Sequence, residues 1–343
     1  MKSFAELFDD CTSKGTKIKT DEYLESGVYA VVDQGQNDIA GYTNLEEGVF
    51  TDVPAIIFGD HTRVIKYIDE PFFLGADGVK LLKAKDRDAN YKYLYYALRN
   101  AKIPNTGYNR HFKWLKDVSI RYPDADKQKE IVQILEKLEG IIASRKTELE
   151  QLDLLIKARF VEMFGNPIYN TKNLPLKNLN ELGTWNSGGT PSRTKPAYFT
   201  GDIDWYSAGE LNTRYLNGSI EKITEEAMEE SAAKLFKAGS MLVGMYDTAA
   251  FKMGILKVDS ASNQACACIE PNESVNIVWL YYSLQLMKEH FLSRRRGVRQ
   301  KNLNLGMIKG FEIPVADRGS QDEFVSFVKQ VDKSKFVCYI IHS

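Results

Sequence analysis

The feature that most constrains the fold is an internal repeat that spans the chain. In each half, an aromatic segment is followed by a basic segment containing glycine, then by a short stretch that ends in proline, and then by a polar segment. Such an ordered match indicates one structural unit used twice. The matching segments are residues 93–96 and 279–282, 107–110 and 297–300, 120–123 and 311–314, and 127–132 and 320–325.

The repeat extends upstream and suggests the content of each unit. Residues 13–16 stand opposite residues 187–192. Residues 55–59 stand opposite residues 240–244, and apolar runs ending in glycine predict strands that lead into turns. Each unit then has a predicted helix near its end, over residues 91–98 and 278–291. We therefore expect the α+β fold class, with a first domain over residues 1–126 and a second over residues 166–319.

A long helix is predicted between the two units. Its apolar residues recur in alternating steps of three and four, interrupted by Arg145 and Arg159, which is typical of a coiled-coil seam that needs a partner helix. Residues 127–164 would form a rod of roughly 57 Å, and Gly165 predicts its end. The spacer is thus expected over residues 127–165, with a seam made by Ile131, Leu135, Leu138, Ile142, Leu149, Leu152, Ile156 and Met163.

Length and composition exclude several classes. A chain of 343 residues predicts about two domains of roughly 150 residues each. No apolar run approaches the roughly 20 residues of a membrane-spanning helix, and residues 1–10 are too polar for a signal peptide, so we expect a cytoplasmic protein with no membrane contact. Cys266 and Cys268 are interpreted as one buried face of a strand. Because the cysteines and histidines lack metal-ligand spacing, no metal and no cofactor are expected.

The formal net charge of −1 restricts any contact with nucleic acid to local patches. Two repeat-equivalent segments combine cations for phosphates with flat polar groups for base edges. A solvated charge run is the alternative for either segment, but the recurrence favours DNA contact. These candidate DNA-binding residues are Tyr108, Asn109, Arg110, His111 and Lys113 in the first half, and Arg294, Arg295, Arg296, Arg299, Gln300, Lys301 and Asn302 in the second.

Further candidates lie in loops rich in glycine, serine and threonine. Such loops can bring backbone N–H groups close to phosphates, although many are plain turns. The segments 60–63 and 207–212 are plausible base readers by the same reasoning. The candidate DNA-binding residues in these loops are Lys14, Lys17, Lys19, His61 and Arg63 in the first half and Ser187, Thr190 and Arg193 in the second.

Several segments resemble the specificity subunits of type I restriction-modification enzymes. Residues 155–167 are similar to the central conserved helix of that family, and residues 185–193 and 198–205 look like the start of one of its target-recognition domains. Residues 57–62 and 107–111 resemble another variety of that domain. The resemblance implies a non-catalytic protein that reads two half-sites on double-stranded DNA. It also implies two methyltransferase subunits and a motor/nuclease subunit as partners.

The end of the chain departs from the family pattern. A second long helix is expected to pack antiparallel on the first, but here it is predicted to run from about Gln321 to about Phe336, and residues 337–343 lack heptad character. Residues 320–343 are therefore interpreted as a shortened second helix with an atypical tail. We expect Phe324, Val328 and Val331 to pack near Leu152, Ile156 and Met163, which leaves residues 131–142 without a partner in the chain. A truncated subunit that is silent, or that dimerises as an interaction protein, is the alternative function.

Enzymatic interpretations have little support. Residues 166–169, Asn-Pro-Ile-Tyr, are similar to the Asn-Pro-Pro-aromatic motif of amino methyltransferases, but they lack the second proline and follow a helix. No G-x-x-x-x-G-K-[ST] loop is present. Pro123-Asp124 has no acidic-x-Lys partner at a distance suited to a nuclease metal site. No Ser-His-Asp triad is indicated either.

Overall fold

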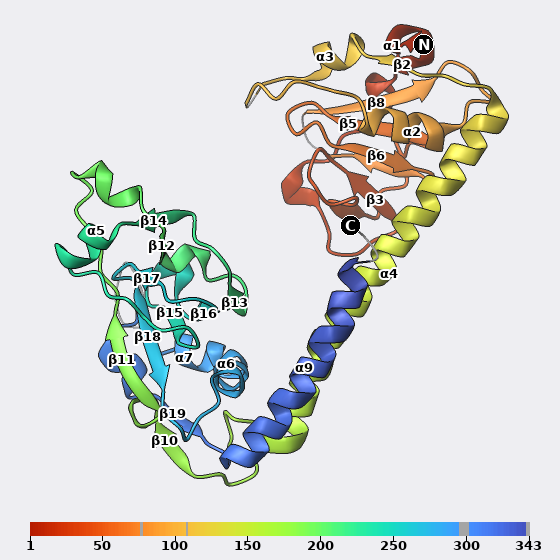
Figure 1. Cartoon of the computed structure of the whole chain (residues 1–343). Helices are drawn as coiled ribbons and strands as arrows, with labels where there is room; N and C mark the ends of the chain where they lie inside the picture. The colour runs from red at the N-terminus through yellow and green to blue at the C-terminus, as the bar shows by residue number, and fades with distance from the viewer. Residues whose placement is uncertain (76–77, 108, 295–301, 341–343) are drawn as a thin grey trace. The chain divides into compact units, whose positions relative to one another are not determined.

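The structure is a computed structural model that describes residues 1–75, 78–107, 109–294 and 302–340, and of residues 247 and 336–340 only the backbone. The chain divides into two compact units, Met1–Ser144 and Arg145–Ser343 (Figure 1). Within the described residues, no helix is long and apolar enough to cross a membrane.

The first unit contains a four-stranded antiparallel sheet and a three-stranded mixed sheet. A short pair of strands, β1 (Lys2–Ser3) and β9 (Ser119–Ile120), joins the start of this unit to its end. The larger sheet has the order β2 (Phe8–Asp10), β8 (Val79–Ala84), β5 (Ala55–Gly59), β6 (Ile65–Ile68), and the smaller has the order β4 (Gly41–Thr43), β3 (Tyr29–Val32), β7 (Phe72–Leu74).

Helices cover one face of the larger sheet in the first unit. Ile56 and Phe58 of β5 pack with Leu94 of α2, whereas Ile57 points to the other face and packs with Phe72. Burial on both faces explains why β5 is an unbroken apolar run rather than an alternating one. The helical segments of this unit are α1 (Phe4–Leu7), η1 (Thr12–Lys14), η2 (Thr20–Glu22), α2 (Tyr91–Arg99), α3 (Phe112–Lys116) and the start of α4 (Ala125–Phe164).

The second unit contains a five-stranded sheet, a three-stranded sheet and a two-stranded pair. The five-stranded sheet has the order β11 (Gly183–Ser187), β18 (Cys266–Pro271), β15 (Met241–Gly244), β16 (Met253–Leu256), β13 (Tyr215–Leu216). The three-stranded sheet has the order β14 (Glu221–Ile223), β12 (Ile203–Tyr206), β17 (Ala261–Ser262), and the pair is β10 (Leu176–Asn178) with β19 (Glu312–Pro314).

Helices complete the second unit. The predicted helix over residues 278–291 is two helices, α6 (Ile277–Leu286) and α7 (Lys288–Leu292), separated at Met287. The Asn276 side chain caps α6 by accepting a hydrogen bond from the Val278 N–H at 3.1 Å. The remaining helical segments are η3 (Leu179–Glu181), η4 (Pro196–Phe199), η5 (Ala208–Glu210), α5 (Glu225–Glu229), η6 (Asp247–Ala249), α8 (Leu305–Lys309) and α9 (Arg318–Ile340).

The strand topology repeats between the two units, which confirms the predicted duplication. The order β2-β8-β5-β6 in the first unit matches β11-β18-β15-β16 in the second. The order β4-β3-β7 matches β14-β12-β17, with one antiparallel and one parallel pairing in each. Buried glutamines match as well, because Gln128 Nε2 donates to the Pro123 carbonyl and Gln321 Nε2 donates to the Ala316 carbonyl, both at 2.8 Å. Cys266 and Cys268 lie buried on β18, as predicted.

The long helix α4 spans 40 residues and ends at Phe164, as predicted, where Gly165 adopts a positive φ of 76°. In the second unit, the end of α4 packs antiparallel on α9 (Figure 1). Arg159 pairs with Glu323 near one end of this contact, and Asp153 pairs with Lys335 near the other. Phe324, Val328 and Val331 share one core with Leu152, Ile156 and Met163, which confirms the predicted pairing.

Two predictions about the helices were wrong. The helix α9 runs from Arg318 to Ile340, so it starts before Gln321 and continues past Phe336. A heptad pattern reports what a helix packs against, and it does not report where the helical backbone ends. The predicted seam also omitted Phe160 and Phe164, which are almost fully buried against Phe324.

Candidate nucleic-acid interface

In the first unit, Asp60 and His111 tie the loop after β5 to the loop before α3. The Asp60 carbonyl accepts a hydrogen bond from the His111 N–H at 2.7 Å, and Asp60 Oδ1 accepts one from the Phe112 N–H at 2.7 Å. The His111 ring is fully buried, with Nδ1 3.0 Å from the Asp60 carbonyl oxygen and Nε2 3.4 Å from Thr106 Oγ1. These contacts hold the two loops together at the end of β5.

The buried position of His111 corrects its interpretation as a DNA contact. A ring with no exposed surface and with partners at both nitrogens cannot reach a phosphate or a base edge. His111 is instead a positioning residue for its neighbours Asn109, Arg110 and Lys113, which are exposed. Asn109 Nδ2 donates to the Thr106 carbonyl at 2.5 Å, and Lys113 lies over the Trp114 ring at 4.1 Å. Tyr108 lies outside the described residues.

His61 and Arg63 are both partly buried in the loop after β5. The His61 N–H donates to Gln34 Oε1 at 3.2 Å, which joins this loop to the end of β3. Arg63 has a φ of 62°, a backbone conformation that few residues other than glycine adopt, and its Nη1 donates to the Ile103 carbonyl at 3.3 Å. Arg63 also lines a cleft of about 470 Å³ that includes Asp38. The loop is therefore held in one conformation by contacts on both sides.

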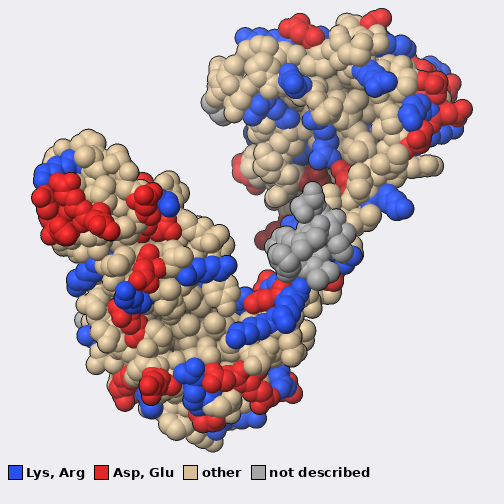
Figure 2. Space-filling view, viewed as in Figure 1, with Lys and Arg blue, Asp and Glu red and all other residues tan. Residues whose placement is uncertain are grey.

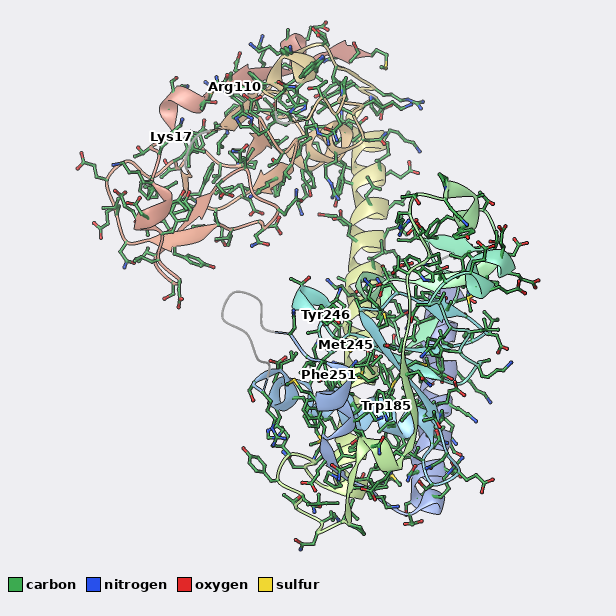
Figure 3. The ribbon with its side chains drawn as sticks, turned by 90° about the vertical axis from the view of Figure 1, so that its left-hand side faces the viewer. Lys17, Arg110, Trp185, Met245, Tyr246 and Phe251 are labelled. Carbon is green, nitrogen blue, oxygen red and sulfur yellow. The ribbon has the colours of Figure 1, made fainter. Side chains whose placement is uncertain are left out.

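A lysine-bearing loop follows β2 in the first unit. The Ile18 N–H donates to the Leu74 carbonyl at 2.9 Å, and the Leu74 N–H donates to the Thr16 carbonyl at 3.0 Å, so β7 anchors the loop backbone. The side chains of Lys14, Lys17 and Lys19 are exposed. Figure 3 shows Lys17 and Arg110 on the same side of the first unit. Exposed cations from two separate segments thus gather on one side of the first unit.

In the second unit, the glycine-rich loop after β11 is packed inside the domain. The Gly188 N–H donates to the Cys266 carbonyl at 3.1 Å, and the Gly189 N–H donates to the Ser262 carbonyl at 2.9 Å. A Cβ atom would lie 2.3 Å from the Ser262 carbonyl oxygen at Gly188, and 2.1 Å from the Ala232 carbonyl oxygen at Gly189. The glycines are therefore needed for close packing, and their N–H groups are not available for phosphate. The plain-turn alternative describes this loop better.

The polar candidates of this loop are also engaged within the domain. Arg193 makes a bidentate contact with Glu221, at 2.5 and 2.8 Å, and its guanidinium lies 4.2 Å from the centre of the Phe199 ring. The hydrogen bond raises the pKa of Arg193 and lowers the pKa of Glu221. Thr190 donates to Gln264, and Ser187 is half-buried in β11. Arg193 is thus a paired cation.

Acidic side chains are concentrated on α5 and directly after it. Figure 2 shows Asp and Glu over the part of the second unit that carries α5 and β14. The exposed carboxylates of α5 are Glu225, Glu226 and Glu229, and Glu230 next to them pairs with Lys195 at 2.8 Å. A surface with this excess of negative charge repels a phosphate backbone. Any DNA contact by the second unit is expected elsewhere.

The loop after β15 is the equivalent of residues 60–63 in the first unit. The Met245 carbonyl accepts a hydrogen bond from the Leu303 N–H at 2.8 Å, just as the Asp60 carbonyl accepts one from His111. Tyr246, next in the loop, is 40% exposed, and Phe251 at its end is buried (Figure 3). Tyr246 stands two residues after Gly244, as His61 stands two residues after Gly59, so the repeat itself points to this position.

The basic segment of the second unit is described only at its edges. Arg294 is exposed after α7, and Asn302 is partly buried before α8. The other candidates, Arg295, Arg296, Arg299, Gln300 and Lys301, lie outside the described residues.

Metal chemistry gains no support from the described part of the chain, where no group of three or more His, Cys, Asp or Glu side chains could hold an ion. Burial raises the pKa of the Cys266 thiol to about 12, so this thiol is protonated at neutral pH.

Comparisons with known proteins agree on one family. The family profile described as "Type I restriction modification DNA specificity domain" matches residues 1–154 and 172–336. The type I restriction enzyme EcoR124I/EcoR124II specificity subunit of Escherichia coli is 25% identical over 336 residues, which cover 92% of this chain and 82% of that protein. The MjaIX specificity subunit of Methanocaldococcus jannaschii is 25% identical over 166 residues, which cover 47% of this chain and 38% of that protein.

Solved structures share the fold. A type I restriction-modification S subunit from M. genitalium aligns with a TM-score of 0.57 at 15% identity, over 99% of this chain and 92% of that one. A chain from a structural study of complex assembly and conformational transition of the type I R-M system aligns with a TM-score of 0.56 at 14% identity, over 97% of this chain and 88% of that one.

Proposed function

The chain belongs to the type I restriction-modification DNA specificity family, and from this premise we propose that each of its two units reads one half of a bipartite target on double-stranded DNA. The protein carries no reaction of its own. Methyltransferase subunits, two in number, and a motor/nuclease subunit bind it in the cytoplasm and act on the DNA that it selects.

The observation that carries this proposal is the structural repeat. In both units, a loop after the central strand is held by a backbone hydrogen bond from the segment that precedes a short helix. A rigid loop that presents side chains at equivalent places in two copies suits a target read as two half-sites. The domains that we assign are residues 1–126 and 166–319, with residues 127–165 as the spacer and residues 320–343 as the second helix.

The exposed residues of the first unit are of two chemical kinds, which suit two kinds of DNA contact. Lys14, Lys17 and Lys19 are flexible point charges suited to phosphates, which give affinity without sequence choice. Arg110 and Asn109 carry the flat guanidinium and amide groups that can pair with guanine and adenine edges in the major groove. Asn109 and Arg110 directly precede His111, whose buried ring and backbone N–H both contact the Asp60 carbonyl, which supports their assignment to one reading loop. In the second unit, Tyr246 is 40% exposed, and Arg294, the first candidate of the basic segment, is exposed as well.

The test needs the target, which methylome sequencing of the host with and without the gene would supply. Binding of the methyltransferase complex to a duplex with that target is then measured by fluorescence anisotropy at several salt concentrations. Replacing Lys17 and Arg110 by alanine should weaken binding by roughly 2–4 kcal/mol in total and reduce the salt slope. Lys127→Ala, an exposed lysine at the start of α4, is the matched control and should leave both unchanged. Unaltered binding by the double variant would remove this surface from the proposal.

A further inference from the structure

Lys66 of β6 is a buried lysine of the first unit, and its side chain is only 2% exposed. It stands opposite Ile57 in the pairing of β5 with β6, so both side chains leave the sheet on the same face. A buried charge costs free energy unless it is paired and hydrogen-bonded. The partners of Lys66 therefore show what this lysine holds in place.

These partners belong to the segment that follows β3, residues 33–38. Lys66 Nζ donates to the Asn37 carbonyl at 2.5 Å and lies 3.6 Å from Asp33 Oδ1. Asp33 Oδ1 also accepts a hydrogen bond from the Gly35 N–H at 2.7 Å. One amine thus contacts this segment at two places, four residues apart, and fixes its path beside the sheet.

The same segment supports the loop after β5. Thr62 Oγ1 donates to the Gln34 carbonyl at 2.6 Å, and the His61 N–H donates to Gln34 Oε1 at 3.2 Å. Gln34 therefore contacts the loop through both its backbone and its side chain. A chain of contacts runs from β6 through residues 33–38 to the loop that carries residues 60–63.

Two glycines leave Gln34 the space that it occupies. A Cβ atom on Gly59 would lie 3.0 Å from Gln34 Cβ. A Cβ atom on Gly78 would lie 2.6 Å from Gln34 Nε2, and the φ of Gly78 is 90°. Gln34 is thus closely surrounded, and a shift of its segment would move the loop with it.

The second unit has an equivalent segment beside its own loop. The strands β3 and β12 end at Val32 and Tyr206, whose carbonyls accept hydrogen bonds at 2.8 and 2.9 Å from the segment after the neighbouring parallel strand. Gln34 and Ala208 each follow two residues later. A Cβ atom on Gly244 would lie 3.6 Å from Ala208 Cβ, which matches the approach of Gln34 in the first unit. The segment after the middle strand therefore borders the loop in both units.

The two units hold this segment by different means. Lys66 pairs with Ile57, and Gly254 pairs with Leu242, at matching positions of the repeat. In the second unit the segment forms β13, which pairs with β16, and a Cβ atom on Gly254 would lie 2.6 Å from the Leu216 side chain. In the first unit the described strand order ends at β6. There the Lys66 amine holds the segment that a fifth strand holds in the second unit.

We propose that Lys66 is a positioning residue for base reading, because it holds residues 33–38 against the loop after β5. This inference rests on the proposed function, in which that loop meets DNA. Since Lys66 is almost fully buried, it makes no phosphate contact of its own. Its loss should affect the choice of sequence and leave the salt dependence of binding unchanged.

The variant Lys66→Met removes the amine and keeps an unbranched side chain. Discrimination is measured in the methyltransferase complex, as the Kd for a duplex with one base pair changed divided by the Kd for the target duplex. For the parent chain this ratio should be roughly 10 or more in either half-site. Lys66→Met should lower it by roughly 3- to 10-fold at one half-site only, because a loosened loop no longer fixes its side chains. The salt slope should remain that of the parent.

Lys83→Met is the matched control. Lys83 lies on β8 of the same sheet, its side chain is 13% exposed, and its Nζ donates at 2.8 Å to the carbonyls of Asp52 and Pro54, before β5. This variant also loses a lysine that holds a loop, but it should discriminate as the parent does. Thr62→Val breaks the contact with Gln34 from the other side and should act like Lys66→Met. Thr62→Ser keeps the hydroxyl and should behave as the parent.

Hydrogen exchange of the purified full chain without DNA tests the support of the loop directly. The amides of residues 60–64 should exchange roughly 10-fold faster in Lys66→Met, and at the parental rate in Lys83→Met. Unchanged exchange, or faster exchange with unchanged discrimination, overturns the inference and leaves the proposed function intact. An equal loss at both half-sites, or the same loss in Lys83→Met, also overturns it, because general destabilisation would explain both. A parent chain that discriminates at neither half-site overturns the proposed function and this inference with it.

Discussion

The two units carry equivalent helix pairs, α2 with α4 in the first unit and α6 with α9 in the second. A further helix segment covers the second pair, whereas a cleft lies beside the first. Tyr93 and Ile131 match Trp279 and Phe324, and both pairs lie at the junction between a domain and a helix. In the second unit a third helix segment covers the junction, whereas in the first unit the matching side chains line an open cleft. The difference teaches that the apolar pattern of a helix specifies a packing face, and that the rest of the chain decides whether the face is filled.

The largest expected effect tests the covered face. Phe160→Ala should destabilise the second unit by about 3–5 kcal/mol, because the ring is almost fully buried between Trp279 and Phe324. Leu138→Ala, at a position that is 49% exposed, should cost less than about 1 kcal/mol. Hydrogen exchange of α9 and of α2 reports the two units separately, which matters because a two-unit chain need not unfold in one step. Equal losses of unfolding free energy on substitution of Phe160 and Leu138 would contradict the difference between the covered and the open face.

A smaller effect is expected at two polar networks, Arg214 with Asp332 and Arg99 with Glu139, whose carboxylates occupy matching positions of the repeat. Asp332→Asn should cost about 2–3 kcal/mol, because the side chains of Arg214 and Asp332 are only 16% and 28% exposed and the arginine loses a charged partner. Glu139→Gln should cost about 0–1 kcal/mol, since Arg99 and Glu139 are 47% and 48% exposed. Urea unfolding followed by exchange in each unit provides the measurement. If Glu139→Gln lowers the free energy of unfolding more than Asp332→Asn does, burial does not explain the difference between the two networks.

The smallest expected effect is a change in DNA affinity on substitution of Arg193 in the second unit. Arg193→Ala should change the affinity for target duplex by less than about 0.5 kcal/mol, because the charge of this arginine is already paired with Glu221. Arg110→Ala should cost about 1–3 kcal/mol if the exposed guanidinium reads a base. Anisotropy titrations of the two variants at one salt concentration give the answer. An Arg193 variant that loses more affinity than the Arg110 variant would falsify our choice of surface in the second unit.

Much of the fold follows from periodic patterns. The step pattern between Ile131 and Met163 predicted a long helix, and Gly165 predicted its end, because a positive φ at glycine terminates a helix by local backbone physics. The match of Phe324, Val328 and Val331 with the end of α4 also followed, since an antiparallel partner must start at the far end of the first helix. Helix ends without such a local signal were less predictable, as α9 shows.

The candidate site was less predictable than the fold. Lys17 and Arg110 are distant in sequence and lie on one side of the first unit, which only the folded sheets could show. Arg193 and Arg110 look alike in sequence, yet one is neutralised by Glu221 and the other is exposed. His111 and Lys113 belong to one basic segment, and one is buried while the other is exposed. Whether a polar side chain meets solvent or a partner depends on residues far away in the chain.

The sequence by itself determined that one unit occurs twice, that a long helix joins the copies and that this helix carries an apolar seam. These properties follow from local periodicity and from repeated order, both of which are written along the chain. The tertiary structure alone decided that His111 supports a loop, that the amides of Gly188 and Gly189 are used internally and that the seam is covered at Ile156 and open at Leu138. Whether a side chain is buried or paired depends on which segments lie close to it in the fold, and those segments are distant in the sequence.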